Sequence, residues 1–173
     1  MFKNLNPSAL GLSGHQSEVI ELALTYGFGG MDLNLVEFAT RVKLRGMPYA
    51  RRLIDSAKLR LGTFALPFGL ESDDETFKRD LERLKLYAQM AAEVGCTRAV
   101  VTIAPTSEKL PYHENFELHR RRLVEVGGLL ASSGVRLGVG FRATSSSPNG
   151  QALQFIHDFE ALSLLVKMVG SPN

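Results

Sequence analysis

The sequence predicts an α/β protein in which helices alternate with parallel strands. One pattern recurs in three places: a helical segment ends at a glycine and a short apolar run follows. The glycines are Gly27, Gly95 and Gly134. A glycine just past a helix is the usual left-handed cap, and an aliphatic run behind it is typical of a buried parallel strand. The pattern begins once more at Gly170, three residues before the sequence ends.

Composition indicates a folded protein of ordinary kind. Apolar residues make up 45% of the 173 residues and charged residues 22%, so we expect one domain over residues 1–173. The net charge of +2 is too small and dispersed to indicate a nucleic-acid partner. No stretch is long and apolar enough for a membrane span or a signal core, and the single Cys96 fits a reducing compartment. We therefore expect a cytoplasmic protein, with Cys96 a small buried residue.

The first half of the chain predicts three strands and their helices. Residues 9–12 form an apolar run that we expect to be the first strand, followed by a helix that begins with a capping box of Ser13 and Gln16. Residues 29–34 are the predicted second strand. A helical pattern over 35–57 breaks at 46–48, which predicts two short helices, and residues 59–67 are the predicted third strand.

The second half predicts two more strands. A capping box at Ser72 and Glu75 opens a helix that runs to Val94, with apolar residues on one face. Residues 97–103 form the fourth strand, and a polar loop over 104–112 leads to a helix over 113–133. The fifth strand covers 135–141, a polar loop covers 144–150, and the last helix runs from near His157 to Val169.

Two architectures fit five alternating units. Parallel strands joined by helices make either an open doubly wound sheet or an incomplete (β/α)₈ barrel. The loop after the first strand lacks the glycine-rich phosphate motif of doubly wound nucleotide-binding proteins. A barrel is typically about 250 residues long, so five units in this length favour a TIM barrel that stops before its sixth strand.

Three segments resemble the sugar phosphate isomerase/epimerase family, the xylose isomerase-like TIM barrels that also include AP endonuclease family 2. They are residues 21–33 (ELALTYGFGGMDL), 91–98 (AAEVGCTR) and 133–139 (SGVRLGV). Residues 166–173 (VKMVGSPN) are similar to the segment before the sixth strand of such barrels, so the resemblance covers the N-terminal portion of the fold. Strands three and four lack the terminal histidines of the nuclease members, which disfavours DNA repair.

The resemblance implies a divalent metal, Mn²⁺, Mg²⁺, Co²⁺ or Zn²⁺, at the carboxyl end of the barrel. It also implies a small sugar or polyol as the substrate. The family's first metal ligand is a glutamate at the end of strand five, and that position corresponds to Gly140 here. The other ligands come from strands six to eight. No metal site is therefore recognisable in this chain, and no catalytic residue can be assigned.

Residues at the carboxyl ends of barrel strands are candidates for substrate binding. Asp32 is either a substrate or proton-relay group or a paired polar residue in the barrel mouth. Arg142 follows strand five and either binds a substrate phosphate or hydroxyl or pairs with an acidic loop residue. His157 either binds substrate or is satisfied at the start of its own helix. We interpret His15 as an exposed capping residue and His113 as part of a plain helix start.

The run 119–122 (HRRR) is the one basic cluster, and we expect it to form a solvated helix face rather than a phosphate site. Three hypotheses follow for the whole chain. It is part of a sugar isomerase or epimerase that is inactive as a fragment, a non-catalytic sugar-binding protein, or an open-sheet domain complete in itself. Homo-oligomers stay an open alternative, because exposed strand edges tend to pair.

Overall fold

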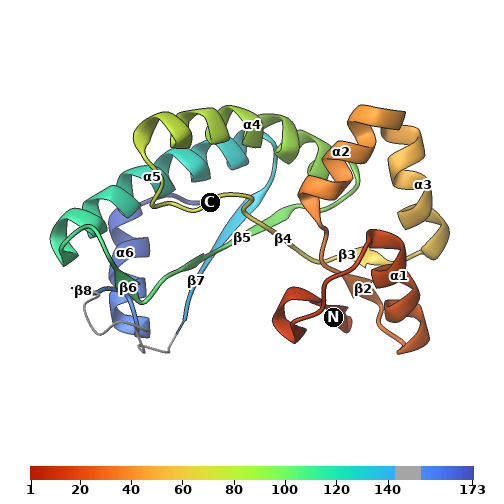
Figure 1. Ribbon diagram of the computed structural model, residues 1–173, viewed down its shortest axis with the longest axis horizontal. Helices are drawn as coiled ribbons and strands as arrows, with labels where there is room; N and C mark the ends of the chain where they lie inside the picture. The colour runs from red at the N-terminus through yellow and green to blue at the C-terminus, as the bar shows by residue number, and fades with distance from the viewer. Residues whose placement is uncertain (143–152) are drawn as a thin grey trace.

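The computed structural model describes residues 1–142 and 153–173. Figure 1 shows them as an arch of helices around twisted strands. The helices are α1 (Gln16–Thr25), α2 (Leu35–Arg45), α3 (Met47–Ala57), α4 (Asp74–Glu93), α5 (Tyr112–Ser132) and α6 (Phe159–Val169), with a 3₁₀ turn η1 (Ser8–Leu10). The strands are β1 (Asn4–Leu5), β2 (Gly30–Met31), β3 (Arg60–Leu61), β4 (Phe64–Ala65), β5 (Arg98–Ile103), β6 (Thr106–Ser107), β7 (Arg136–Phe141) and β8 (Leu153–Gln154).

The main strands are parallel and follow the order of the chain. One sheet has the order β1-β2-β3 and another has the order β4-β5-β7, with parallel pairing throughout both. The short strands β6 and β8 pair antiparallel to each other. Sequential parallel strands with helices between them are the arrangement of a TIM barrel. The fold class predicted from the sequence, an incomplete barrel, is confirmed.

The predicted third strand, residues 59–67, joins the two sheets. Its first part, β3, pairs with β2, and its second part, β4, pairs with β5. Between them, Gly62 N donates to Met31 O at 2.9 Å, and Leu33 N donates to Thr63 O at 2.8 Å. Backbone bonds thus continue along the whole segment, and the strands form one continuous curved wall.

The glycine hinges behave as the sequence predicts. Gly27, Gly95, Gly134 and Gly170 all have positive φ, between 63° and 81°. After α1, α4 and α5 the same hydrogen bond closes the helix end, for example Val135 N donating to Leu130 O at 3.0 Å. This is the Schellman arrangement, which turns the chain directly from a helix into the next strand.

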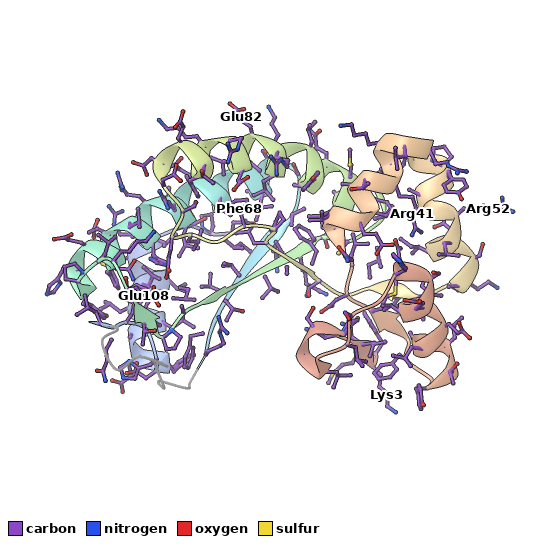
Figure 2. The ribbon with its side chains drawn as sticks, in the orientation of Figure 1. Lys3, Arg41, Arg52, Phe68, Glu82 and Glu108 are labelled. Carbon is purple, nitrogen blue, oxygen red and sulfur yellow. The ribbon has the colours of Figure 1, made fainter. Side chains whose placement is uncertain are left out.

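The core lies between the strands and the helices. In β5 the side chains of Ala99, Val101 and Ile103 are buried, whereas Val100 is half-buried and Thr102 is exposed. The buried set joins one apolar cluster with residues of α4 and α5, such as Leu84 and Leu130. Figure 2 agrees: Phe68 lies beneath α4 on its strand side, whereas Arg52 and Glu82 lie at the outer surface. The opposite face of the strands is left for the barrel interior.

The predicted first strand is wrong. Residues 9–12 lie partly in the 3₁₀ turn η1, and the strand that pairs with β2 is β1 at Asn4–Leu5. Leu5 is buried, whereas Leu10 and Leu12 are 62% and 45% exposed. Pairing with a neighbouring strand and burial of Leu5 therefore outweigh the more continuous apolar run that follows.

Both predicted capping boxes start at the wrong residue. At α1 the residue before the helix is His15, whose backbone N donates to Glu18 Oε2 at 2.7 Å. At α4 the cap is Asp73, which accepts from Thr76 N at 2.8 Å. Carboxylates accept such bonds more strongly than the amide or hydroxyl we predicted, and Ser72 O is already held by Arg122.

Smaller differences concern element ends. The second strand is shorter than predicted, so Asp32 follows β2 rather than lying within it. The polar loop over 104–112 contains β6, and the last helix begins at Phe159, two residues after His157. The loop predicted over 144–150 lies outside the described residues. Among the helices that the structure describes, none has the length and apolar character needed to cross a membrane.

Candidate functional site

A cavity of about 1260 Å³ is lined in part by residues of β2 and β5. Its wall includes residues that follow β2, β4, β5 and β7, so it lies at the carboxyl ends of the parallel strands. Active sites of TIM barrels occupy this end, because the loops there vary while the strands hold them in place. The cavity is therefore the candidate functional site.

Small side chains keep the strand wall of this cavity open. Val100 and Thr102 of β5 line it, and their partners across the parallel ladder are Gly138 and Gly140 of β7. A Cβ atom at Gly140 would have only Val101 O nearby, at 3.9 Å. The wall therefore has room for a ligand or for a longer side chain at Gly140.

Asp32 lines the cavity and also joins three strands. Its Oδ1 accepts from Asn4 Nδ2 at 2.7 Å and from Thr63 N at 2.9 Å. Gly62 is required beside it, because a Cβ atom there would collide with the Asn4 side chain. One oxygen of Asp32 thus serves the fold. Both roles that the sequence left open for Asp32 are compatible with this position.

Arg142 also lines the cavity, and it is exposed. Its backbone N donates to Ile103 O at 3.4 Å, which continues the β5–β7 pairing beyond the end of β7. Within the described residues no carboxylate lies close enough to form an ion pair with it. Its role in substrate binding stays a prediction.

His157 is not among the residues that line the cavity. Its Nδ1 lies 2.8 Å from Phe155 O, and its Nε2 lies 3.8 Å from Asp158 Oδ2. Asp158 is the cap of α6 and accepts from Ala161 N. The observed contacts of His157 are thus those of a histidine held by its own segment, and the structure does not bring it together with Asp32 and Arg142.

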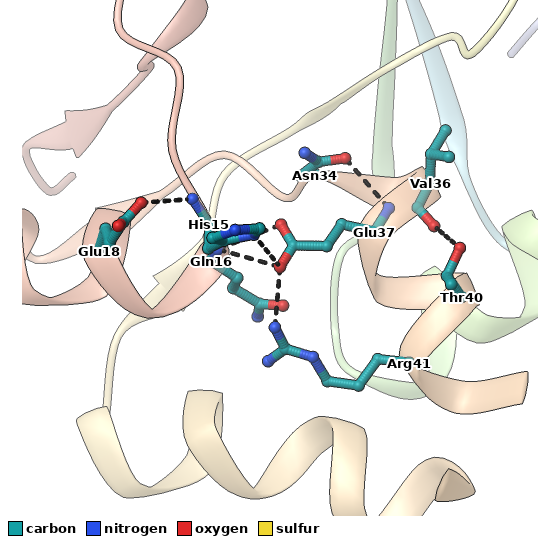
Figure 3. Close-up of polar contacts among 8 residues, drawn as sticks. All are labelled: His15, Gln16, Glu18, Asn34, Val36, Glu37, Thr40 and Arg41. Atoms are coloured by element: carbon teal, nitrogen blue, oxygen red, sulfur yellow. Dashed lines mark hydrogen bonds and ion pairs between the residues drawn. The ribbon is translucent and has the colours of Figure 1, made fainter. Parts of the chain in front are cut away.

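The exposed capping histidine expected at position 15 is observed, and it belongs to a partly buried network around Glu37 (Figure 3). Glu37 accepts from Gln16 N at 3.1 and 3.2 Å and from Arg41 Nη2 at 2.8 Å. His15 Nδ1 lies 3.8 Å from Glu37, with its side chain 81% exposed. This network joins the start of α1 to α2.

The basic run over 119–122 is only partly solvated, which corrects our prediction. Arg121 is exposed, but His119 and Arg122 are only 1% and 2% exposed. They are three residues apart and therefore share one face of α5, directed at the loop between β4 and α4. A run that we assigned to solvent thus supplies the polar contacts that hold this loop.

Arg122 anchors the loop. Its Nη1 donates to Leu70 O at 2.7 Å and to Ser72 O at 2.6 Å, and its Nη2 donates to Asp74 Oδ1 at 2.6 Å. The guanidinium also lies 4.5 Å from the centre of the Phe77 ring. A buried charge needs such complete pairing, since an unpaired one is strongly unfavourable. The loop is therefore fixed at its carbonyl groups.

His119 and Glu71 lie at the cavity wall beside this anchored loop. Burial lowers the pKa of His119, partly offset by its bond to Asn115 O, so the neutral imidazole is favoured. Burial also raises the pKa of Glu71, an effect that the charge of Lys109 opposes. Sequence reasoning missed both residues. The signal available was the spacing of His119 and Arg122 on an apolar helix face.

The described residues do not fit a metal site of the family type. They contain no group of three or more His, Cys, Asp or Glu side chains that could hold a metal ion. Gly140, at the position that the resemblance assigns to the first ligand, offers no side-chain donor. Within the described residues, the chemistry of this site therefore depends on the individual side chains that line the cavity.

Comparison with known proteins identifies the family. The family model described as "Xylose isomerase-like TIM barrel" matches residues 20–173, and this chain belongs to that family. No match was found among curated proteins.

Solved structures agree with the fold. A xylose isomerase domain protein from Alicyclobacillus acidocaldarius is 20% identical to this chain, with a TM-score of 0.84. The match covers 99% of this chain and 60% of that protein's chain. The IOLI protein with a bound zinc atom is 15% identical to this chain, with a TM-score of 0.76. The match covers 99% of this chain and 60% of the IOLI chain. D-psicose 3-epimerase with D-tagatose, from Clostridium cellulolyticum H10, is 11% identical to this chain, with a TM-score of 0.73. The match covers 98% of this chain and 60% of the epimerase chain. The present chain thus spans about 60% of the length of these structures.

Proposed function

We propose that this chain is the N-terminal part of a barrel enzyme whose intact form isomerises or epimerises a small sugar or polyol. The observation that carries the proposal is the cavity at the carboxyl ends of the parallel strands of a xylose isomerase-like barrel. One of the similar structures is an epimerase with D-tagatose, which supports a sugar as the ligand class. We further propose that Arg142 and Asp32 face the sugar from two sides of this cavity.

We propose a bound divalent metal only for the intact form of the enzyme. One similar structure holds zinc, so a divalent metal is consistent with the family. The described residues of this chain supply no ligand set for it. We therefore propose that residues 1–173 alone are catalytically inactive.

The test is an epimerisation assay on D-tagatose with the intact protein, with Mn²⁺, Mg²⁺, Co²⁺ or Zn²⁺ added in turn. Conversion monitored by NMR would support the enzyme. Binding of D-tagatose without any conversion would support a second function, a non-catalytic sugar-binding protein. Absence of both binding and conversion, across ketoses and polyols, would reject both functions.

The second function rests on Gly140, the position that the resemblance assigns to the family's first metal ligand. A substitution separates the two functions further. Gly140 has open space around its Cβ position, so Gly140→Glu is expected to fold. If the intact protein holds the remaining ligands, Gly140→Glu increases its affinity for Mn²⁺ in a calorimetric titration. Gly138→Glu, on the same face two residues earlier in β7, is the matched control.

A further inference from the structure

Two hydrogen-bond acceptors face each other at the cavity wall, one from α5 and one from the loop after β4. His119 Nδ1 lies 2.8 Å from Asn115 O. A backbone carbonyl can only accept, so His119 Nδ1 carries the proton and Nε2 has a free lone pair. This geometry fixes the tautomer of a neutral His119.

The second acceptor is Glu71. Its Oε1 lies 3.9 Å from His119 Nε2, beyond the roughly 3.2 Å limit of a good N–H···O hydrogen bond. In the part of the chain that the structure describes, this is the only ion-pair contact of Glu71. A carboxylate and a bare imidazole nitrogen cannot satisfy each other, so both require donors from elsewhere.

The surrounding contacts hold this pair in place. Three hydrogen bonds from Arg122 fix the loop on both sides of Glu71. The His119 ring packs at 4.9 Å from the Phe155 ring, and His119 is 1% exposed. Phe68 lines the cavity in the same loop as Glu71 and lies beneath α4 in Figure 2. An apolar ring and two acceptors in the wall of one cavity are suited to a ligand that carries hydroxyl groups on a carbon skeleton.

We propose that His119 and Glu71 form a subsite for two adjacent hydroxyl groups of a polyol. One hydroxyl donates to His119 Nε2 and its neighbour donates to Glu71. Two acceptors 3.9 Å apart match two donors held side by side, with each O–H···acceptor distance about 2.8 Å. The proposal rests on the proposed function, because it assumes that the cavity takes a sugar or polyol.

The test is calorimetric titration of D-tagatose and its monodeoxy analogues into the intact protein and three variants, Glu71→Gln, Glu108→Gln and His119→Phe. Glu71→Gln removes the carboxylate from a half-exposed position and is expected to fold. Glu108→Gln is the matched control, because Glu108 is an exposed carboxylate close enough to influence Glu71 but does not line the cavity. We expect Glu71→Gln to weaken D-tagatose binding roughly tenfold or more, and Glu108→Gln to leave it unchanged.

The analogues locate the diol. For the unsubstituted protein, two analogues that lack hydroxyls on adjacent carbons are expected to bind more weakly than D-tagatose. In Glu71→Gln, whose amide oxygen is a weaker acceptor than a carboxylate, one of these two losses becomes smaller, and in His119→Phe the other one disappears. Equal D-tagatose affinity in the unsubstituted protein and Glu71→Gln overturns the subsite while leaving the proposed function intact. If the unsubstituted protein binds no sugar or polyol, both proposals fail together.

Discussion

Two carboxylates of the cavity wall differ in what they contact. One oxygen of Asp32 accepts hydrogen bonds from two groups of neighbouring strands, Asn4 Nδ2 and Thr63 N. Among the described residues, the Glu71 carboxylate has ion-pair distance only to another acceptor, His119 Nε2, at 3.9 Å. Both lie at the carboxyl ends of strands and both line the same cavity. Their position alone therefore does not distinguish a group that holds strands together from a group that is free to bind a ligand.

The difference follows from the backbone around each carboxylate. Asp32 lies where the two sheets meet, and unpaired donors of neighbouring strands need an acceptor there. The backbone carbonyls around Glu71 already have their donor in Arg122, so the carboxylate is not needed for the loop. We therefore expect substitutions at the Asp32 site mainly to reduce stability, and substitutions at Glu71 mainly to reduce binding.

The largest loss of stability is expected on substitution of Arg122. Its hydrogen bonds hold the loop carbonyls and so leave the Glu71 carboxylate free to bind a ligand. Arg122→Met leaves two carbonyls and Asp74 without their donor, and it should lower the free energy of unfolding by about 3 kcal/mol. Urea denaturation measures this change. Arg121→Met, at the exposed neighbour, should change the free energy by less than about 0.5 kcal/mol. Similar values for the two variants would show that Arg122 does not anchor the loop.

The next prediction separates the two carboxylates directly. Asp32→Ala leaves Thr63 N and Asn4 Nδ2 unpaired and should cost about 2 kcal/mol of unfolding free energy. Asp32→Asn keeps an acceptor for both donors, so it should cost less than about 1 kcal/mol. Thermal or urea unfolding gives both values. Glu71→Gln should leave the free energy of unfolding nearly unchanged. If Glu71→Gln destabilises the protein as much as Asp32→Ala does, the two carboxylates do not differ in their contribution to the fold.

Acidification should affect the His119 side of the site. Burial lowers the pKa of His119 below its ordinary value of 6.5, so the unfolded chain binds the proton more readily than the folded one. Stability is therefore complete above about pH 6.5 and is lost as the pH falls toward the folded-state pKa. The Arg122 guanidinium disfavours the protonated ring further.

Titration of Glu71 changes stability with pH in the opposite direction, so its effect must be eliminated by substitution. Its pKa is raised above 4.5, so its contribution is present at low pH and is lost as the pH rises through the folded-state pKa. Unfolding curves should therefore be compared for Glu71→Gln and for Glu71→Gln with His119→Gln. Between about pH 7 and pH 5 the single variant should lose more stability than the double variant. Parallel pH profiles would exclude His119 as the cause.

Much of the fold was predictable from local signals. The glycine hinges, the apolar face of α4 and the break between α2 and α3 are each specified by residues close together in the sequence. The first strand was mispredicted because its identity depends on pairing with β2, which lies about 25 residues away along the chain. Strand pairing is a tertiary property that a short apolar run does not encode.

The candidate site was less predictable for the same reason. Asp32 and Arg142 could be selected because they follow predicted strands at the active end of a barrel. His119 lies within a helix, and its role depends on a loop about 50 residues earlier in the chain that Arg122 holds. Hydrophilic composition suggested solvent for the whole run, whereas helical spacing placed two of its members on the buried face.

The smallest effect concerns Cys96, and it tests whether burial alone decides which side chains of this protein are accessible. Cys96 is fully buried in the apolar core, and burial raises the pKa of its thiol to about 12. Its thiolate is therefore scarce, and we expect no reaction with Ellman's reagent in the native state at pH 8. The matched control is Glu71→Cys, which places a second thiol in the cavity wall. That thiol should react within minutes, and both should react after denaturation. A fast native reaction of Cys96 would show that the core opens around it, and the contrast between core and cavity wall would then be one of dynamics rather than of static burial.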